Sequence, residues 1–387
     1  MGTASKLAAM LTISVWLGLL SACEQDEAVE PTDPPAATAS EKPASTPAAG
    51  GNGGTSEPSP EPERPYEVLA DQLRVPWVIE FAADTVYISE REGNVVMVDG
   101  QDMTRQKVNL QKSVHGQGEG GFLGFLLAPD FEQSKEAYAY HTYEEDGETY
   151  NRVVVLKQTG DQWDEVKPLL EGIPGAANHD GGRMAYGPDR LLYITTGDAQ
   201  QRELAQDKDS LAGKILRMTL DGKVPADNPF PGSYIYSYGH RNPQGLAWTD
   251  DGVMLVTEHG PSGSPGGHDE INIVEPGGNY GWPAIYGDAK QSGMSTPVYH
   301  TGETAIAPSG ATIDGRNRML IATLVGSALY RFDRATKEMS IVFEGEGRLR
   351  DVKINDGRVY VITNNTDGRG VPGERDDRLL VLNGIND

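Results

Sequence analysis

The sequence predicts an all-β fold, a six-bladed β-propeller, and two observations support this prediction. From Tyr66 onward, short runs of β-branched and aromatic residues alternate with clusters of glycine, aspartate and asparagine, without a long helical periodicity. A unit of strand, polar loop and second strand then recurs six times, at spacings typical of propeller blades. The first strands of the units are expected at Val86–Ser89, Tyr138–Tyr140, Leu192–Thr195, Met254–Thr257, Met319–Ala322 and Val359–Ile362.

A closed ring is expected because each unit pairs its first strand with a partner strand. A blade of this kind buries both faces against its neighbours, and radial closure removes the long exposed edges of a flat sheet. Loops on one face of the ring converge on its axis, so residues distant in sequence can share a site. A large β-sandwich, or two separate β-domains, is the alternative fold. The partner strands include Val95–Val98, Val153–Leu156, Ile215–Met218, Ala328–Arg331 and Leu379–Leu382.

Residues 1–22 are expected to be a lipoprotein signal peptide. Lys6 precedes an apolar run over residues 7–20, which leads into Ser21, Ala22 and Cys23. The run is short for a membrane-spanning helix, and no basic stop-transfer segment follows it. Cys23 would then carry the lipid and become the mature N-terminus. An ordinary secretory signal with a chance cysteine is the alternative.

Residues 23–65 are expected to be a disordered tether between the lipidated cysteine and a propeller domain over residues 66–387. The tether is rich in Pro, Ala, Thr, Ser, Gly and Glu, so it cannot bury enough apolar surface to offset its ordering entropy. The expected protein is exported, periplasmic or at the cell surface, and meets the membrane only through its lipid anchor. Glu24 is compatible with an outer-membrane location in a Gram-negative cell.

The composition excludes several classes of partner and of chemistry. A net charge of −24 opposes binding to nucleic acid and to anionic lipid surfaces, although a merely solvated acidic surface also explains it. Cys23 is the only cysteine, so no disulfide within the chain, zinc–thiolate cluster or iron–sulfur centre can form. The sequence also lacks a nucleophile elbow, a P-loop and an H-E-x-x-H motif.

The unusual polar segments are expected in loops that follow the first strands of the units. In one of them, Asn178–Arg183, His179 stands beside two glycines, and Asp198 follows the strand of the third unit. A carboxylate that holds the imidazole Nδ1–H fixes the tautomer, which is an arrangement of acid–base catalysis. A histidine with a purely structural role is the alternative.

Two segments suit an anionic ligand. The turn at Gly239–Gly245 places Arg241 beside two amides, which fits a planar, multiply charged group. Arg348 and Arg350 alternate along an expected strand, so both side chains can face one anion. A polar turn capped by its own side chains, and a solvated strand edge, are the alternatives.

A further group of segments suits calcium. Glycine and proline in Glu258–Pro261 expose backbone carbonyls, and carboxylates and amides follow in Asp269–Asn272 and Asn279–Pro283. Calcium accepts carbonyl and carboxylate oxygens as ligands. Loops with solvated acids are the alternative.

A collinear set of motifs extends over about residues 68–383 and covers almost the whole expected domain. It comprises Pro76-Trp77, Glu119–Phe125, Pro129–Phe131, Asn178–Arg183, Asp227–Phe230, Gly239–Gly245, Glu258–Pro261, Asp269–Asn272, Asn279–Pro283 and Ala307–Gly310. With this set, the chain resembles the soluble quinoprotein aldose (glucose) dehydrogenases. The resemblance implies oxidation of aldose sugars to lactones with pyrroloquinoline quinone (PQQ) and Ca²⁺, and transfer of electrons to an external acceptor.

The resemblance implies roles for three catalytic residues. His179 would take the proton from the anomeric hydroxyl, while hydride passes from the sugar C1 to the quinone C5. Asp198 would orient His179 and stabilise its charged form. Arg241 would neutralise charge that develops on the quinone oxygen.

The resemblance also implies the binding residues. Arg348 and Arg350 would pair with the cofactor carboxylates, and Glu119 would lie in the pocket, where it can touch the substrate. The backbone carbonyls of Gly260 and Pro261 would hold calcium against the quinone, where it acts as a Lewis acid. Expected contacts with the cofactor are Arg241, Asn242, Gln244, Arg348, Arg350 and Glu119. Glu270 and Tyr280 resemble a second, structural calcium site.

The sequence departs from this family at two positions. Members can carry a cofactor-facing lysine just after the equivalent of Thr323-Leu324, and this chain has Val325 there, so one positive contact is missing. His259 stands where glucose-specific members can carry an amide, and a glycine-rich loop follows it. The broad aldose-oxidising branch is therefore favoured over a strict glucose enzyme.

Two other functions remain open at this stage. A calcium-dependent lactone hydrolase can also have a six-bladed propeller, but it would use metal-bound water and would not need Arg241, Arg348 and Arg350 to converge. A non-catalytic propeller that binds surface glycans or proteins would not need the pair His179 and Asp198. For the favoured dehydrogenase, the partners are an aldose and an unidentified electron acceptor: a quinone, a cytochrome or a dye.

Overall fold

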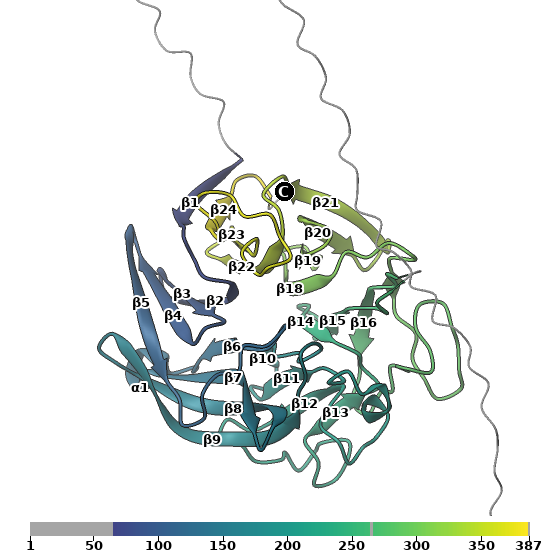
Figure 1. Ribbon diagram of the computed structural model, residues 1–387. Helices are drawn as coiled ribbons and strands as arrows, with labels where there is room; N and C mark the ends of the chain where they lie inside the picture. Colours follow the sequence, from purple (N-terminus) through teal and green to yellow (C-terminus); the bar gives the residue numbers. More distant parts are fainter. Residues whose placement is uncertain (1–64, 264–265, 386–387) are drawn as a thin grey trace, which may run out of the picture. The chain divides into compact units, whose positions relative to one another are not determined.

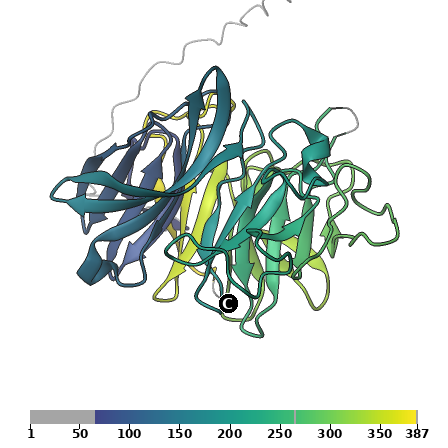
Figure 2. The same ribbon diagram turned by 90° about the horizontal axis from the view of Figure 1, so that it is seen from below.

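The computed structural model describes residues 65–263 and 266–385, which form a ring of six four-stranded antiparallel blades (Figure 1). The innermost strand of each blade lies nearest the centre of the ring, and Figure 2 shows the blades from the side. The expected six-bladed propeller is thus confirmed. The expected signal peptide over residues 1–22, and all but the last residue of the expected tether over 23–65, lie outside the described residues.

The first three blades use consecutive strands. The first blade consists of β2 (Pro76–Ala82), β3 (Thr85–Glu90), β4 (Asn94–Asp99) and β5 (Asp102–Asn109). The second consists of β6 (Phe122–Leu127), β7 (Glu136–Glu145), β8 (Glu148–Thr159) and β9 (Gln162–Pro174). The third consists of β10 (Met184–Tyr186), β11 (Leu192–Thr196), β12 (Lys214–Met218) and β13 (Ile235–Tyr238). The first two blades also join at their outer edges, where β5 pairs in parallel with β9.

The last three blades repeat the plan and close the ring. The fourth blade consists of β14 (Pro243–Trp248), β15 (Met254–Glu258), β16 (Glu270–Val274) and β17 (Tyr299–His300). The fifth consists of β18 (Pro308–Ile313), β19 (Met319–Thr323), β20 (Ala328–Asp333) and β21 (Glu338–Glu344). The sixth consists of β22 (Leu349–Asn355), β23 (Arg358–Thr363), β24 (Leu379–Leu382) and β1 (Tyr66–Ala70). In the sixth blade β1 pairs with β24, with Tyr66 opposite Leu382, so the two ends of the domain share one sheet.

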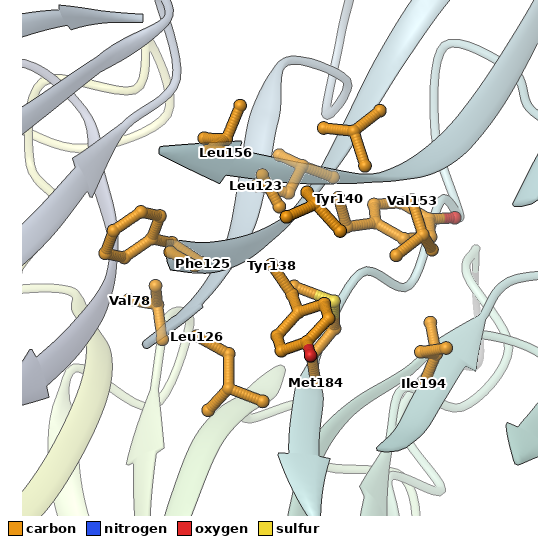
Figure 3. Packing of buried hydrophobic residues seen from close by; sticks show 14 of the residues in the cluster. Val78, Leu123, Phe125, Leu126, Tyr138, Tyr140, Val153, Leu156, Met184 and Ile194 are labelled. Atoms are coloured by element: carbon orange, nitrogen blue, oxygen red, sulfur yellow. The ribbon is translucent and has the colours of Figure 1, made fainter. Parts of the chain in front are cut away.

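Apolar side chains fill the spaces between neighbouring blades. Separate clusters pack blade six on blade one, blade five on six, blade three on four and blade four on five, while the largest unites the first three blades. Figure 3 shows part of this cluster, where Val78, Phe125, Tyr138 and Met184 come from four different strands. Because both faces of each sheet are buried in this way, the hydrophobic contribution to stability depends on the closed ring.

The expected first strands are the second strands of their blades, which corrects the sequence-based positions. All six coincide with β3, β7, β11, β15, β19 and β23, and the expected partner strands coincide with third strands. Each blade has an additional innermost strand that lines the axis. His179 and Arg241 therefore do not follow a first strand, as expected, but lie in the loops that lead into the innermost strands β10 and β14.

Helices contribute little to the described part of the chain. One turn of α-helix, α1 (Phe131–Ser134), and a short 3-10 helix, η1 (Arg202–Ala205), are the helical elements within residues 65–263 and 266–385. No helix in those residues has the length and apolar character needed to cross a membrane.

Candidate active site

Loops from several blades surround a cavity of about 500 Å³ on one face of the ring, which we call the outer cavity. The loops lie between β5 and β6, between β9 and β10, after β11, between β13 and β14, after β15 and after β23. They bring together side chains from distant parts of the sequence. The lining includes Glu119, His179, Asp198, Arg241, Ser262 and Arg369.

His179 and Asp198 form the best-defined pair in the outer cavity. His179 Nδ1 lies 2.7 Å from Asp198 Oδ1, and the second oxygen of this fully buried carboxylate accepts a 2.8 Å hydrogen bond from Trp282 Nε1. A carboxylate with two such partners is fixed in place and selects the tautomer with the proton on Nδ1. The nitrogen of His179 that stays available on the cavity side is therefore Nε2.

The local backbone is built to bring these two residues together. His179 has a φ of +68°, a left-handed conformation that is uncommon for a residue with a side chain. Gly197 lies directly beneath it, and a Cβ on Gly197 would be only 1.9 Å from the His179 carbonyl oxygen. The glycine therefore permits the close approach of the two loops, and the strained histidine is a marker of a functional position.

Arg241 lies beside this pair and is held on both sides of its guanidinium. Its Nη2 donates to Ser262 Oγ at 2.8 Å, and its guanidinium carbon lies 5.4 Å from the centre of a ring of Trp282. A backbone hydrogen bond also links the two loops, because Asp198 N donates to Arg241 O at 2.8 Å. The cation is thus pre-positioned next to His179 and Asp198, where it can stabilise negative charge.

Glu119 enters the outer cavity from the loop before β6. Its Oε1 accepts a 2.7 Å hydrogen bond from Arg369 Nη1, and its Oε2 accepts from the backbone N of His179 at 3.2 Å. Burial opposes ionisation of Glu119, but His259, Arg369 and the His179 amide outweigh it and lower the pKa of Glu119 to about 2. Glu119 is therefore a carboxylate acceptor at neutral pH.

A narrow inner chamber lies next to the outer cavity, with Trp77, Gln244, His259 and Arg350 among its lining residues. Arg350 Nη1 donates to Gln244 Oε1 at 2.9 Å and to Ser309 Oγ at 3.2 Å. Burial, and then repulsion by Arg91, lower the pKa of Arg350 to about 9. No carboxylate lies within 4.0 Å of this buried cation among the described residues.

A side cavity of about 400 Å³ also adjoins the chamber and is lined by Arg348, Leu324, Val325 and Arg369, among others. Arg348 Nη2 pairs with Asp367 Oδ2 at 2.8 Å. Arg348 and Arg350 do not share one partner, but they border adjoining cavities, and Val325, which is 57% exposed, contributes no charge there.

The chamber suits a flat ligand with several negative charges. Two residues that line the chamber each have a buried nitrogen without a hydrogen-bond partner among the described residues, Arg350 Nε and His259 Nε2, and Arg348 Nε in the side cavity is in the same condition. Leaving such groups unsatisfied is costly, and a polycarboxylate could satisfy them.

Asn242 differs from Gln244, because it is fully buried under the His179 loop and its Oδ1 accepts from the Gly181 amide at 3.1 Å.

The expected calcium loop follows β15 and is anchored by Asp269. Asp269 Oδ1 accepts from Gly260 N at 2.9 Å, while Oδ2 accepts from Ile306 N at 2.6 Å and from Ala307 N at 2.8 Å. Within the described residues, neither the Gly260 nor the Pro261 carbonyl accepts a backbone hydrogen bond. These two oxygens thus remain free to coordinate a hard cation.

The second expected calcium site lies between β15 and β16. Glu258 and Glu270 are directly opposite each other in the two paired strands, and both are buried. Burial and the charge of Glu258 raise the pKa of Glu270 to about 8, and the buried Oδ1 of Asn272 has no partner. Tyr280 stacks on His240, and its hydroxyl donates to Ile273 O, so only its backbone carbonyl could bind a metal.

Calcium in either place would depend on backbone oxygens as well as carboxylates. The described residues contain no group of three or more His, Cys, Asp or Glu side chains placed to hold a metal ion. Three of the residues described above carried no predicted role: Trp282, which fixes Asp198; Ser262, which accepts from Arg241; and Arg369, which pairs with Glu119. Trp282 lies within one of the motifs noted above, but no sequence feature marks Arg369.

Comparisons with known proteins agree with this geometry. The family model described as Glucose / Sorbosone dehydrogenase matches residues 73–376. Quinoprotein glucose dehydrogenase B of Acinetobacter calcoaceticus is 33% identical over 267 residues, which cover 60% of this chain and 55% of that protein's length.

Two solved structures share the whole propeller. An oxidoreductase of Thermus thermophilus, named as a glucose dehydrogenase, is 40% identical with a TM-score of 0.76, over 82% of this chain and 99% of that one. The PQQ-bound form of an aldose sugar dehydrogenase from Streptomyces coelicolor is 37% identical with a TM-score of 0.74, over 82% and 96%. The chain therefore belongs to the glucose/sorbosone dehydrogenase family.

Proposed function

We propose that this protein oxidises aldose sugars to lactones with PQQ and Ca²⁺ and passes the electrons to an external acceptor. One observation carries the proposal: the oriented His179–Asp198 pair opens onto a cavity that adjoins a chamber lined by Arg350, a buried cation whose Nε has no partner among the described residues. A base and a polyanion site side by side suit a dehydrogenase with an anionic redox cofactor. The PQQ-bound relative from Streptomyces supports the choice of PQQ.

The residues of the chain account for the proton chemistry. His179 Nε2 takes the proton of the anomeric hydroxyl, and Asp198 stabilises the imidazolium that results, because its carboxylate lies 2.7 Å from Nδ1. Arg241 adds a fixed positive charge beside the reacting atoms. Glu119 accepts a hydrogen bond from a second sugar hydroxyl and so orients the ring. Bound PQQ would supply the acceptor for the hydride of the sugar C1.

The binding groups follow from the same cavities. Arg348 and Arg350 hold carboxylates of the cofactor, Gln244 orients Arg350, and Asn242 supports the His179 loop from below. The carbonyls of Gly260 and Pro261 bind one Ca²⁺ as a Lewis acid, and Glu270 with the Tyr280 carbonyl holds a second, structural ion. A quinone or a cytochrome accepts the electrons in the cell, and a dye replaces it in the assay.

The proposed location follows from residues outside the described part of the chain. Residues 1–22 direct export, Cys23 carries the lipid, and residues 23–65 form the tether to the domain over 66–387. A Cys23→Ala variant tests this: the native protein should partition into the detergent phase and the variant into the aqueous phase. Equal partitioning of the two into the aqueous phase would contradict lipidation.

Reconstitution tests the proposed activity. Purified protein is mixed with PQQ and Ca²⁺ and assayed for dye reduction with a panel of aldoses, while its melting temperature is recorded with and without cofactor. Dye reduction that requires both PQQ and Ca²⁺ is the expected result. No reduction with any sugar and no shift in melting temperature would overturn the proposal. Hydrolysis of an aldonolactone without dye reduction would favour a lactone hydrolase.

A further inference from the structure

Arg369 lines all three axial cavities: the outer cavity, the inner chamber and the side cavity. It lies in the loop after β23 and contacts the loops between β5 and β6 and between β9 and β10. Its Nη1 pairs with Glu119 Oε1 at 2.7 Å, and its Nη2 donates to Asn178 Oδ1 at 2.8 Å. The Arg369 side chain therefore lies where all three cavities meet.

The chamber below this ion pair is closed to a large ligand. Its volume is about 10 Å³, compared with about 500 Å³ for the outer cavity and about 400 Å³ for the side cavity. A volume of about 10–15 Å³ holds a single water molecule, so a three-ring tricarboxylate cannot occupy the chamber as it stands. Arg350, whose Nε is unpaired among the described residues, lines this closed space, and Arg348, whose Nε is also unpaired there, lines the side cavity next to it.

Glu119 is the fixed partner of the pair. Its backbone N donates to Ala177 O at 2.7 Å, and Arg91 binds the carbonyls on both sides of it, Gly118 O at 2.6 Å and Gly120 O at 3.0 Å. Its Oε2 accepts from the His179 amide, a hydrogen bond in which Arg369 takes no part. Glu119 thus stays in place and remains partly satisfied if the ion pair opens.

Arg369 is the partner that can move. Its side chain is 51% exposed, whereas that of Glu119 is 20% exposed. Its backbone is anchored, since its N donates to Asp367 Oδ1 at 2.9 Å and Asp367 also pairs with Arg348. A change of rotamer alone can therefore take the guanidinium from Glu119 towards the space bordered by Arg348, and the solvent exposure of the Arg369 side chain limits the cost.

On the basis of the proposed function, we infer that Arg369 is a gating residue for the anionic cofactor. When the cofactor binds, the Arg369 guanidinium leaves the Glu119 carboxylate and pairs with a carboxylate of the cofactor instead. The exchange conserves ion pairs, because one carboxylate replaces another. It opens the chamber towards the outer cavity and frees Glu119 Oε1 to accept a sugar hydroxyl. It also adds a cation beside neutral Val325. Cofactor binding and sugar binding are thereby coupled through one side chain.

Binding of PQQ, measured by fluorescence titration in saturating Ca²⁺, tests the inference without turnover. We expect Arg369→Gln to raise the Kd about tenfold or more, the effect of losing one charge-assisted contact, and Arg369→Lys to raise it less. Arg375→Gln is the matched control, because Arg375 lies in the same loop but pairs with Asp71 and lines a different cavity. It should bind PQQ like the native protein.

A double-mutant cycle with Glu119→Gln separates gating from simple charge effects. If Glu119 competes with PQQ for Arg369, Glu119→Gln should lower the Kd in the native background and leave it unchanged in the Arg369→Gln background. The same gain in both backgrounds, or a native Kd for Arg369→Gln, would overturn the inference while the proposed function stands. Failure of the native protein to bind PQQ would instead overturn the proposed function and, with it, the gate.

Discussion

Asp198 Oδ1 lies 2.7 Å from His179 Nδ1, and this contact joins the loop after β11 to the loop before β10 at the mouth of the outer cavity. Trp282 Nε1 holds the other carboxylate oxygen at 2.8 Å, so the carboxylate cannot rotate away without losing a buried hydrogen bond. The imidazole is therefore oriented before any ligand binds. This is the pre-organisation that a general base requires.

Asp198→Asn tests the orienting role of the carboxylate. The amide keeps the shape and a hydrogen bond, but it can present its NH₂ group to Nδ1 and so favour the wrong tautomer. We expect kcat to fall about 10²- to 10⁴-fold, while the Kd for PQQ changes little. Steady-state dye reduction and a PQQ titration on the same sample measure both quantities. A kcat within about twofold of native would show that the tautomer is fixed in another way.

Without the cofactor, substitution of Arg350 and substitution of Arg348 should affect the free energy of unfolding differently. Arg350 is a buried cation without a carboxylate partner, so Arg350→Gln should leave the free energy of unfolding unchanged or raise it by about 1 kcal/mol. Arg348→Gln leaves buried Asp367 without its cation and should lower the free energy of unfolding by about 3 kcal/mol. Urea unfolding of the cofactor-free variants measures this, and both should bind PQQ at least tenfold more weakly. Equal destabilisation by the two substitutions would contradict this account of Arg350.

Calcium should stabilise the protein more at high pH than at low pH. The folded chain keeps a proton on Glu270 up to a pKa of about 8, whereas the unfolded chain releases it near 4.5. Between these values the folded state binds more protons, so the calcium-free protein loses stability as the pH rises. A cation at Glu270 replaces the proton and removes that loss.

The measurement is the gain in melting temperature on adding Ca²⁺ to chelator-treated protein at pH 5 and at pH 8. The gain should be larger at pH 8, and Glu270→Gln should remove the difference between the two pH values. Calcium bound at Gly260 and Pro261 would still contribute a gain that varies little with pH. An equal gain at both pH values in the native protein would argue against a metal at Glu270.

The sequence predicts the central strands of each blade well and the inner and outer strands poorly, for a physical reason. Strands such as β11 and β19 are buried on both faces and begin with the apolar runs Leu192–Ile194 and Met319–Ala322. The innermost strand β10 has only three residues, and β14 begins with Pro243-Gln244-Gly245, residues that are unfavourable in strands. The short length of β10 and the proline and glycine in β14 therefore conceal these two strands in the sequence.

Some residues of the candidate site were predictable from the sequence and others were not. His179, Asp198 and Arg241 come from glycine-rich loops with a distinctive order, and the structure brings them to one cavity. Arg369 lies in a turn with glycines on both sides, and nothing local distinguishes it from a solvated arginine. Its importance comes from the ring closure, which places it next to Glu119 although the two are 250 residues apart. Contacts of this kind follow only from the three-dimensional structure.

The most direct test of the central claim is single-turnover reduction of bound PQQ by an aldose in native protein and in His179→Asn. Asparagine tolerates the φ of +68° at this position, so the backbone should be preserved. We expect the variant to bind PQQ with a Kd close to that of the native protein and to reduce it about 10²- to 10⁴-fold more slowly. Reduction at the native rate by a PQQ-loaded His179→Asn variant would contradict the assignment of His179 as the base.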